Sequence, residues 1–375
     1  MTKTSKIWIV VIVILAIVAG FALWAYKANR QSKVIKIGAV LSLSGDAAQN
    51  GEAEQKGIQL AVEEINASGG IGGKKLEIIF EDDNTDAKST VSAVTKLTSV
   101  DHVPAIIGAT WDFLTNAIVP IIDQNKTVLV TPSTLPDTIT ASSSYLFETH
   151  APIAVLEPAM ETFLSQFVNP RVVIMTINNP WGLAYVRAFE KAAAAKGATI
   201  VKEVILPKFD DNDIQGQLTL LKPLHPDAML TALNFDDSVT FFKRREAFGL
   251  AVPTLAEEKT EGLYAIGDIS ANLLGNVFMD RFSFPNAAFV NAYRARYGSG
   301  PQEYADTAYD AVYAIRQGIL NADGQYTSSA IQAGLKKISG YHGASGIIDF
   351  TKNNYPQNET PVIDELINGK FQAVD

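Results

Sequence analysis

From residue 34 onward, short strand-like runs alternate with longer helical stretches, and this alternation limits the folds open to the chain. The runs are rich in Val and Ile and lie between turn or helix signals, which is typical of buried parallel strands. Strand–helix alternation predicts right-handed crossovers in a doubly wound α/β sheet. The runs are Ile35–Leu43, Leu76–Phe80, Ala105–Ile107, Val128–Val130, Arg171–Ile177, Ile200–Leu206 and Ala228–Leu233.

The body of the chain is too long for one such sheet, so the sequence predicts two α/β lobes. A second series of runs begins at Arg171, with a length and order similar to the first. The tail is mainly helical over Phe289–Leu335 and returns to strand-like sequence at Gly346–Phe350. We therefore expect the chain to cross between the lobes more than once. The main helices predicted from apolar spacing are Ala53–Asn66, Ala184–Lys196 and Tyr304–Leu320.

The charge of the chain is unevenly distributed along the sequence. The formal net charge is -9, but residues 1–33 hold five Lys or Arg side chains and no acid. The remaining residues therefore carry 26 basic and 40 acidic side chains, a formal charge of -14. Nucleic-acid binding depends on basic side chains that neutralise phosphates, so we expect no nucleic-acid partner.

The N-terminal segment, residues 1–33, predicts a membrane anchor. Residues 7–26 are uncharged and mostly apolar, and a helix of that length spans the hydrocarbon core of roughly 30 Å. The run is longer than the apolar region of a signal peptide and has no good A-x-A cleavage site, although a cleaved signal stays open. The chain has no cysteine, which excludes a lipoprotein anchor and disulfides. We expect a single-pass anchor in the cell membrane, with the body periplasmic or at the cell surface.

Known catalytic and cofactor motifs are missing from the sequence. Gly69–Lys74 lacks the spacing of a phosphate loop and leads into a strand, so it reads as a turn. Asp82–Asp86 lacks the Gly and Glu of a calcium loop, and the four histidines are far apart. No nucleophile elbow or dinucleotide fingerprint occurs. We therefore expect no cofactor, no metal and no enzymatic activity, with an α/β enzyme as a remote alternative.

The residues that open each predicted unit resemble one known family. The opening is similar to that of the leucine/isoleucine/valine-binding family of periplasmic solute receptors, which have the type I binding-protein fold. The likeness covers essentially residues 34–375. The segments that carry it are Ile35–Gly45, Ala61–Ile71, Glu81–Asp83, Ile106–Ala109 and Val130–Ser133.

This resemblance implies two Rossmann-like lobes joined by three hinge crossovers, with a ligand held between them. By analogy the first lobe comprises residues 34–150 and 283–345. The second comprises residues 151–282 and 346–375. The lobes of such receptors close around the ligand by hinge bending.

The resemblance also implies a set of ligand contacts. Amino-acid-binding members use helix N-termini and a Ser or Thr hydroxyl for the α-carboxylate, and a hydroxyl, a carbonyl and a Glu for the ammonium. This chain departs from that pattern, because Asp112 stands where an α-carboxylate would bind and Leu135 stands where a Thr is usual. The ammonium partner would be Glu257 or Glu258. The candidate contacts by position are Asn50, Thr110, Trp111, Asp112, Ser133, Leu135, Trp181, Asn234, Glu257 and Glu258.

Each candidate also has a plain structural interpretation. Trp111 and Trp181 could be core residues, and Asp112 could cap the helix Phe113–Gln124, a role that Asp favours. Ser133 could be a turn residue, and the two glutamates could be a solvated pair. If the candidates do line the cleft, its acidic side chains favour a cationic, amide-like or small peptide solute over a plain aliphatic amino acid.

The function that these features predict is an extracytoplasmic solute-binding receptor of an ABC importer. Its partners would be a small amino-acid-like, amide or cationic solute, the permease and ATPase subunits, and the membrane through residues 7–26. A ligand-sensing receptor module of the same fold is the alternative.

Overall fold

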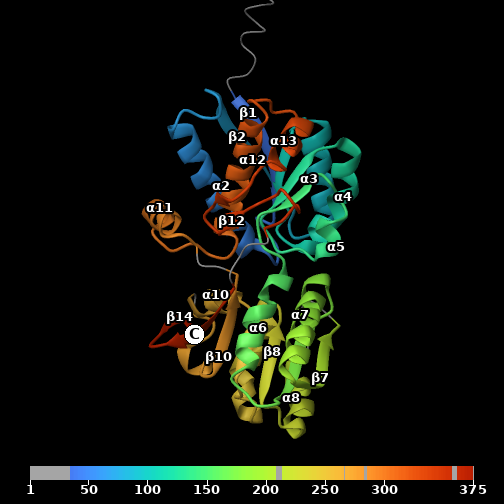
Figure 1. Ribbon diagram of the computed structural model, residues 1–375, viewed down its shortest axis with the longest axis vertical. Coiled ribbons are helices and arrows are strands. Elements are labelled where there is room, and N and C mark those ends of the chain that lie inside the picture. Colours follow the sequence, from blue (N-terminus) through green and yellow to red (C-terminus); the bar gives the residue numbers. More distant parts are fainter. Residues whose placement is uncertain (1–33, 208–212, 266, 283–284, 357–360, 375) are drawn as a thin grey trace, which may run out of the picture.

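In the computed structural model, all described strands except one small hairpin form two separate sheets with helices packed on both faces of each (Figure 1). The structure describes residues 34–374 except 208–212, 266, 283–284 and 357–360. The predicted anchor at residues 7–26 lies outside this range. Among the described residues, no helix is both long and apolar enough to cross a membrane. The predicted α/β fold, with parallel sheets flanked by helices, is confirmed.

The first sheet is wholly parallel and has the strand order β2-β1-β3-β4-β5. Its strands are β1 (Val34–Leu41), β2 (Lys75–Asp82), β3 (Ala105–Gly108), β4 (Val128–Thr131) and β5 (Leu146–Glu148). The helices around it are α2 (Ala48–Ala67), α3 (Ala87–Ser99), α4 (Asp112–Asn125), α5 (Asp137–Thr140), α11 (Ala287–Tyr297), α12 (Ala305–Asn321) and α13 (Ser328–Leu335). A small hairpin of β11 (Tyr341–His342) and β12 (Ile347–Ile348) completes this lobe.

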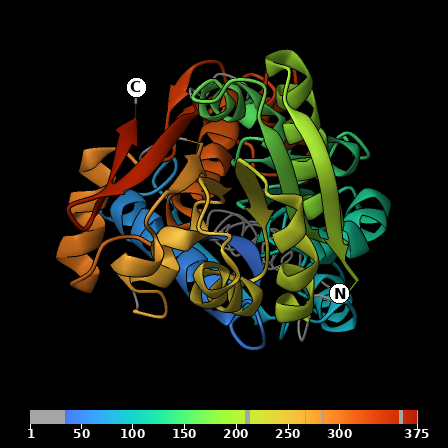
Figure 2. The same ribbon diagram turned by 90° about the horizontal axis from the view of Figure 1, so that it is seen from below.

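The second sheet has the order β14-β13-β10-β9-β8-β6-β7, in which the pairs β10–β13 and β13–β14 are antiparallel and the other pairs are parallel. Figure 2 shows the C-terminal strands at one edge, opposite β7. The strands are β6 (Arg171–Ile177), β7 (Thr199–Leu206), β8 (Ala228–Ala232), β9 (Thr254–Ala256), β10 (Val277–Arg281), β13 (Val362–Ile367) and β14 (Lys370–Val374). The helices are α6 (Glu157–Leu164), α7 (Pro180–Lys196), α8 (Ile214–Leu221), α9 (Phe235–Arg244) and α10 (Lys259–Ala265), with short 3-10 turns η1 (Ile153–Leu156), η2 (Lys222–Leu224), η3 (Arg245–Phe248) and η4 (Ala271–Leu273).

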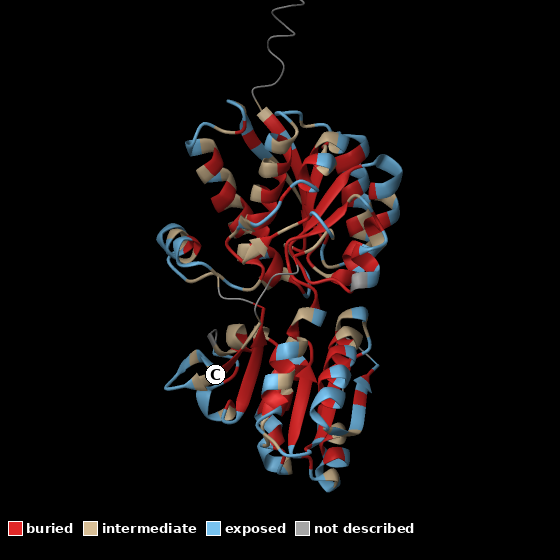
Figure 3. Cartoon of the chain, viewed as in Figure 1, coloured by how far each residue is buried: buried red, intermediate tan, exposed pale blue. Residues whose placement is uncertain are grey.

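Each sheet buries a separate apolar core on each of its faces, as the red strands in Figure 3 show. In β1, Ile35, Ile37 and Leu41 point to the core formed with α2, α12 and α13. Val40 points the other way, into the core formed with α3 and α4. Strands covered on both faces need apolar residues at every position, which is why they appear in the sequence as continuous Val- and Ile-rich runs.

The chain passes between the sheets three times: after β5, after β10 and between β12 and β13. The sequence predicts that the chain changes from the first lobe to the second at residues 345/346. In the structure, the segment after β12 still packs against the first lobe. Ile348 and Phe350 are buried in the core of the first lobe, and the Asn354 carbonyl oxygen accepts a hydrogen bond from the Glu148 backbone N–H. The lobe boundaries stay a prediction, but this packing favours a last crossover after residue 354.

Gly57 makes the close approach of α2 to α12 possible, and this gives a test of the fold. A Cβ atom at Gly57 would lie 2.0 Å from the Ala305 carbonyl oxygen. We predict that Gly57→Ala lowers the free energy of unfolding by about 1–3 kcal/mol, because the two helices must move apart. Urea denaturation measures the change.

The matched control is Gly262→Ala, also in a helix, where a Cβ would meet nothing within 4 Å. Alanine favours helix over glycine by about 1 kcal/mol, so this variant should be as stable as the unmodified protein or more so. Equal destabilisation by both substitutions would contradict the predicted contact.

Candidate ligand-binding site

The parallel strands of each sheet direct their carboxyl ends toward the other lobe (Figure 1). Helices α4, α7 and α9 begin there, and residues at their starts, Asp112, Asn179 and Asn234, line one cavity. Helix N-termini at such edges carry unpaired backbone N–H groups and a partial positive charge. Two adjacent cavities lie at this place, one of about 60 Å³ and one of about 600 Å³. Asn50, Phe235, Lys259, Glu303 and Tyr304 line both of them.

The smaller cavity is lined by residues from both lobes. The first lobe contributes Asn50, Trp111, Asp112, Phe113, Ser133, Thr134, Glu303 and Tyr304, and the second contributes Ile177, Asn179, Trp181, Asn234, Phe235 and Lys259. Six of the ten predicted contacts therefore meet here: Asn50, Trp111, Asp112, Ser133, Trp181 and Asn234. Whether they bind a ligand stays a prediction.

Asp112 links the two lobes directly. It is the first residue of α4, and its Oδ1 accepts a hydrogen bond of 2.6 Å from the Phe113 backbone N–H. Its Oδ2 accepts a hydrogen bond of 3.1 Å from the Trp181 N–H, near the start of α7 in the other lobe. The side chain is buried, and burial raises the Asp112 pKa to about 6 although both hydrogen bonds lower it. One carboxylate thus faces the N-termini of two helices across the cleft.

The two tryptophans of the small cavity are held in place, Trp111 by a hydrogen bond and Trp181 by a ring contact. The Trp111 Nε1–H donates to the Asn50 Oδ1 at 3.3 Å, and the Asn50 Nδ2 donates to the Glu303 Oε2 at 2.9 Å. Burial, followed by repulsion from Glu258, raises the Glu303 pKa to about 7. Trp181 packs edge-on against Tyr185, with ring centroids 5.1 Å apart. These contacts fix both tryptophans as walls of the cavity.

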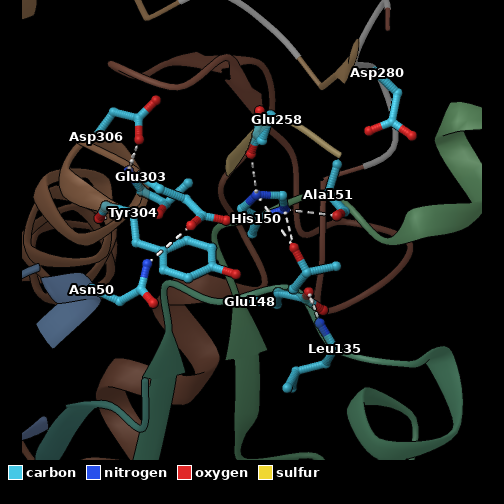
Figure 4. A network of polar contacts seen from close by, with 12 residues as sticks. Asn50, Leu135, Glu148, His150, Ala151, Glu258, Asp280, Glu303, Tyr304 and Asp306 are labelled. Atoms are coloured by element: carbon cyan, nitrogen blue, oxygen red, sulfur yellow. Dashed lines mark hydrogen bonds and ion pairs between the residues drawn. The ribbon is translucent and has the colours of Figure 1, made fainter. Parts of the chain in front are cut away.

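The two predicted glutamates differ in their surroundings. Glu257 is buried outside both cavities, and its Oε1 lies 3.4 Å from the Lys259 Nζ and 3.4 Å from the Ser238 hydroxyl. Glu258 lines the larger cavity, where its Oε1 lies 3.7 Å from the His150 Nε2. Figure 4 shows His150, in the first crossover, between Glu258 and the Ala151 carbonyl oxygen. Of the two glutamates, Glu257 thus already has the Lys259 ammonium group as its ion-pair partner.

Thr110 and Leu135 lie beneath the cavities and do not line them. The Thr110 hydroxyl donates to the Glu54 Oε2 at 2.6 Å and accepts from the Ser42 N–H at 3.0 Å. Leu135 is buried in the core with α3 and α4, and its N–H donates to the Glu148 Oε1 at 2.7 Å (Figure 4). Both residues support the loops that carry Asp112 and Ser133.

Sequence reasoning missed four residues that line both cavities: Phe235, Lys259, Glu303 and Tyr304. The Lys259 Nζ lies 4.4 Å from the Trp181 ring centroid and 5.5 Å from that of Phe235, so a cation stands inside a cleft that the sequence predicts to be acidic. That prediction is incomplete, because the cavity walls carry both signs. The signal available was Lys259 itself, which follows directly after the two candidate glutamates.

Asn234 has one polar group without a partner. It caps α9, with its Oδ1 accepting a hydrogen bond of 2.7 Å from the Asp237 N–H. Its Nδ2 is buried and has no hydrogen-bond partner among the described residues. Ser133, in contrast, donates its hydroxyl hydrogen to the Ala109 carbonyl oxygen at 3.3 Å. Asn234 thus lines the small cavity and holds an amide donor that no described residue uses.

Comparisons with known proteins agree with this architecture. Residues 34–362 match the family model described as periplasmic binding protein. The Leu/Ile/Val-binding protein BraC3 of Rhizobium johnstonii is 26% identical over 318 residues, covering 80% of this chain and 83% of that protein. The Leu/Ile/Val-binding protein of Escherichia coli is 24% identical and covers 82% and 85% of the two chains.

Solved structures share the fold closely. The branched-chain amino acid transporter substrate binding protein LivJ from Streptococcus pneumoniae, in complex with isoleucine, has a TM-score of 0.79 and 25% identity, covering 91% of this chain and 99% of that one. An ABC transporter solute binding protein from R. palustris, in complex with benzoate, has a TM-score of 0.80 and 21% identity, covering 91% and 95%. At that identity the second likeness shows the fold alone.

The buried carboxylate of Asp112 makes a pH-dependent prediction. Because the pKa is raised from 3.8 to about 6, the folded protein holds this proton more tightly than the unfolded chain does. The protonated Asp112 carboxyl group therefore stabilises the folded protein below pH 4, and this stabilisation is lost as the pH rises through 6. The asparagine of Asp112→Asn does not titrate. We predict that its stability relative to the unmodified protein rises between pH 4 and 6, by at most about 3 kcal/mol, and then stays level.

Urea denaturation at several pH values measures this difference. The control is Asp46→Asn, measured in the same way, because the Asp46 side chain is exposed to water. If the difference for Asp112→Asn does not change with pH, this carboxylate is not buried as described.

Proposed function

The chain belongs to the periplasmic binding protein family of solute receptors, and from this premise we propose that it captures an amino acid or a close analogue for an ABC importer. The observation that carries the proposal is the small cavity, whose walls come from both lobes. A solute that touches both walls stabilises the closed arrangement over an open one, which is the condition for a ligand to drive closure. Relatives named for binding leucine, isoleucine and valine support an amino acid as the solute class.

The charges of the cleft suit a solute that carries both signs. Asp112 and Glu303 bring carboxyl groups to the small cavity, and Lys259 brings an ammonium group. A zwitterion can pair with both kinds of wall, whereas a simple cation or a simple anion is repelled by one of them. This favours an amino acid over a polyamine.

The larger cavity supports a finer proposal about the side chain of the solute. Glu258, Glu303 and Asp306 line it, and Glu303 also lines the small cavity. Burial raises the pKa of Glu303 and of Asp306, and repulsion from Glu258 raises both further. A basic or amide-bearing side chain would relieve this crowding of carboxyl groups, and a plain aliphatic one would not.

The family and the N-terminal sequence support a proposal about the location and the partners. We propose that the body is extracytoplasmic and that residues 7–26 tether it to the membrane beside the permease and ATPase subunits. Hinge bending at the three crossovers would open and close the lobes, with the first lobe extended past Phe350. The exposed Asp and Glu side chains of the body are compatible with this aqueous location.

A thermal-shift screen of the purified full chain tests the proposal. We predict that lysine, arginine or glutamine raises the melting temperature most, because their side chains suit the carboxyl groups of the larger cavity. The shift should be measurable, since a ligand at 100 times its dissociation constant adds about 2.7 kcal/mol of stability. Titration calorimetry then gives the affinity. Micromolar binding of leucine, isoleucine or valine, equal to about −8 kcal/mol, would contradict the finer proposal. No shift with any amino acid or amide would overturn the solute class.

A further inference from the structure

The second-lobe wall of the small cavity holds a donor that the protein itself does not use. Asn234 is only 3% exposed, and its Nδ2 has no partner among the described residues, while its Oδ1 is engaged in capping α9. A buried donor without an acceptor costs free energy, so few such groups persist in folded proteins without a reason. Asn234 lines the cavity, so a solute acceptor that reaches the Nδ2 would satisfy this donor.

Lys259 brings a positive charge to the same wall. Its Nζ lies between the aromatic rings of Trp181 and Phe235, and its only ion-pair partner among the described residues is Glu257 at 3.4 Å. Glu257 lies outside both cavities, whereas Lys259 lines both. The cavity therefore meets the cation and not its counter-ion. An amide donor and an ammonium group on one wall are suited to a carboxylate.

The opposite wall has the reverse character. The Asp112 carboxylate already accepts hydrogen bonds from the N-terminal N–H groups of α4 and α7, so the place where these helices would attract an anion is filled. In the described part of the chain, no Lys or Arg lies within ion-pair distance of Asp112. This wall therefore repels a solute carboxylate and attracts a solute ammonium group.

We propose that the cleft binds an α-amino acid with its carboxylate against Asn234 and Lys259 of the second lobe and its ammonium group against Asp112 of the first. This orientation is the reverse of the one that the family resemblance implies. The inference rests on the proposed function, because it needs an amino acid as the solute. The side chain then extends past the shared wall of Glu303 and Tyr304 into the larger cavity.

Three variants separate the two ends of the solute. Asn234→Asp replaces the unused donor by a carboxylate oxygen and keeps the cap of α9, since Asp caps helices as well as Asn does. Lys259→Gln removes the cation, and Asp112→Asn removes the opposing charge. The control is Lys243→Gln, an exposed lysine in the last turn of α9, outside both cavities.

The probes are amino acids and their analogues that lack one charged group. For lysine these are cadaverine and 6-aminohexanoate, and for phenylalanine they are phenethylamine and 3-phenylpropanoate. The leucine set is isoamylamine and 4-methylpentanoate. Calorimetry on the full chain gives the affinity of each probe, and the melting temperature of each variant confirms that it is folded.

We expect Asn234→Asp and Lys259→Gln to weaken the amino acid and its deaminated acid by about tenfold or more, and to leave the amine unchanged or tighter. Asp112→Asn should weaken the amino acid and the amine and leave the deaminated acid unchanged or tighter. A merely structural role would weaken all three probes alike. Lys243→Gln should bind as the unmodified protein does.

The results that would overturn the proposal are distinct from those that would overturn the function. If the unmodified protein binds none of the amino acids, the proposed function fails and the orientation fails with it. If it binds an amino acid but Asn234→Asp leaves the affinity unchanged, only the orientation is wrong. The same holds if Asp112→Asn weakens the deaminated acid instead of the amine.

Discussion

Two helix N-termini that face each other across a cleft repel, and Asp112 removes that repulsion. The arrangement of both sheets leads to this place, because parallel strands direct their carboxyl ends, and the helices that follow, to one edge. α4 and α7 therefore bring partial positive charges together from opposite lobes. The carboxylate accepts one N–H from each helix, so it connects the two lobes. The cavities, the aromatic walls and the distribution of charge in the cleft are arranged around this contact.

The charged side chains of the small cavity are consequently divided between its walls. Among the described residues that line it, the acidic groups Asp112 and Glu303 lie on the first-lobe side and Lys259 lies on the second-lobe side. Glu257 would have made the second wall acidic, but it is buried behind Lys259 and paired with it. Burial raises the pKa of Asp112, Glu257 and Glu303, which means that their ionised forms cost free energy. A solute that brings a positive charge into the cleft lowers this cost.

The sequence predicts the architecture well and the site only in part. Long buried strands such as β6 were predicted at their observed ends, because full burial requires uninterrupted apolar residues. β5 and β9 have three residues each, too few for a pattern to be recognised. Six of the residues that the resemblance predicts do line the small cavity. The resemblance does not predict that the Leu135 side chain is buried in the core or that the Thr110 hydroxyl hydrogen-bonds to Glu54. The direction of a loop side chain depends on contacts distant in sequence. Lys259 was missed for the same reason, since Glu257, Glu258 and Lys259 are adjacent and only the fold decides which of them faces the cleft.

The packing of α12 against α2 has a consequence for the order in which the molecule can be assembled. The first lobe is built from two pieces of chain, and its core contains Ala308, Val312 and Ile315 from the later piece. During synthesis, which begins at the N-terminus, the parallel strands of the second lobe are therefore complete before α12 is available to cover the first lobe. Until α12 arrives, Ile35 and Ile37 of β1 have an incomplete apolar surround, and the contacts that finally bury them span most of the sequence. Such distant contacts slow folding and leave apolar surface open to other chains. The discontinuity that places the crossovers beside the cleft thus makes the first lobe dependent on nearly the whole chain for its own completion.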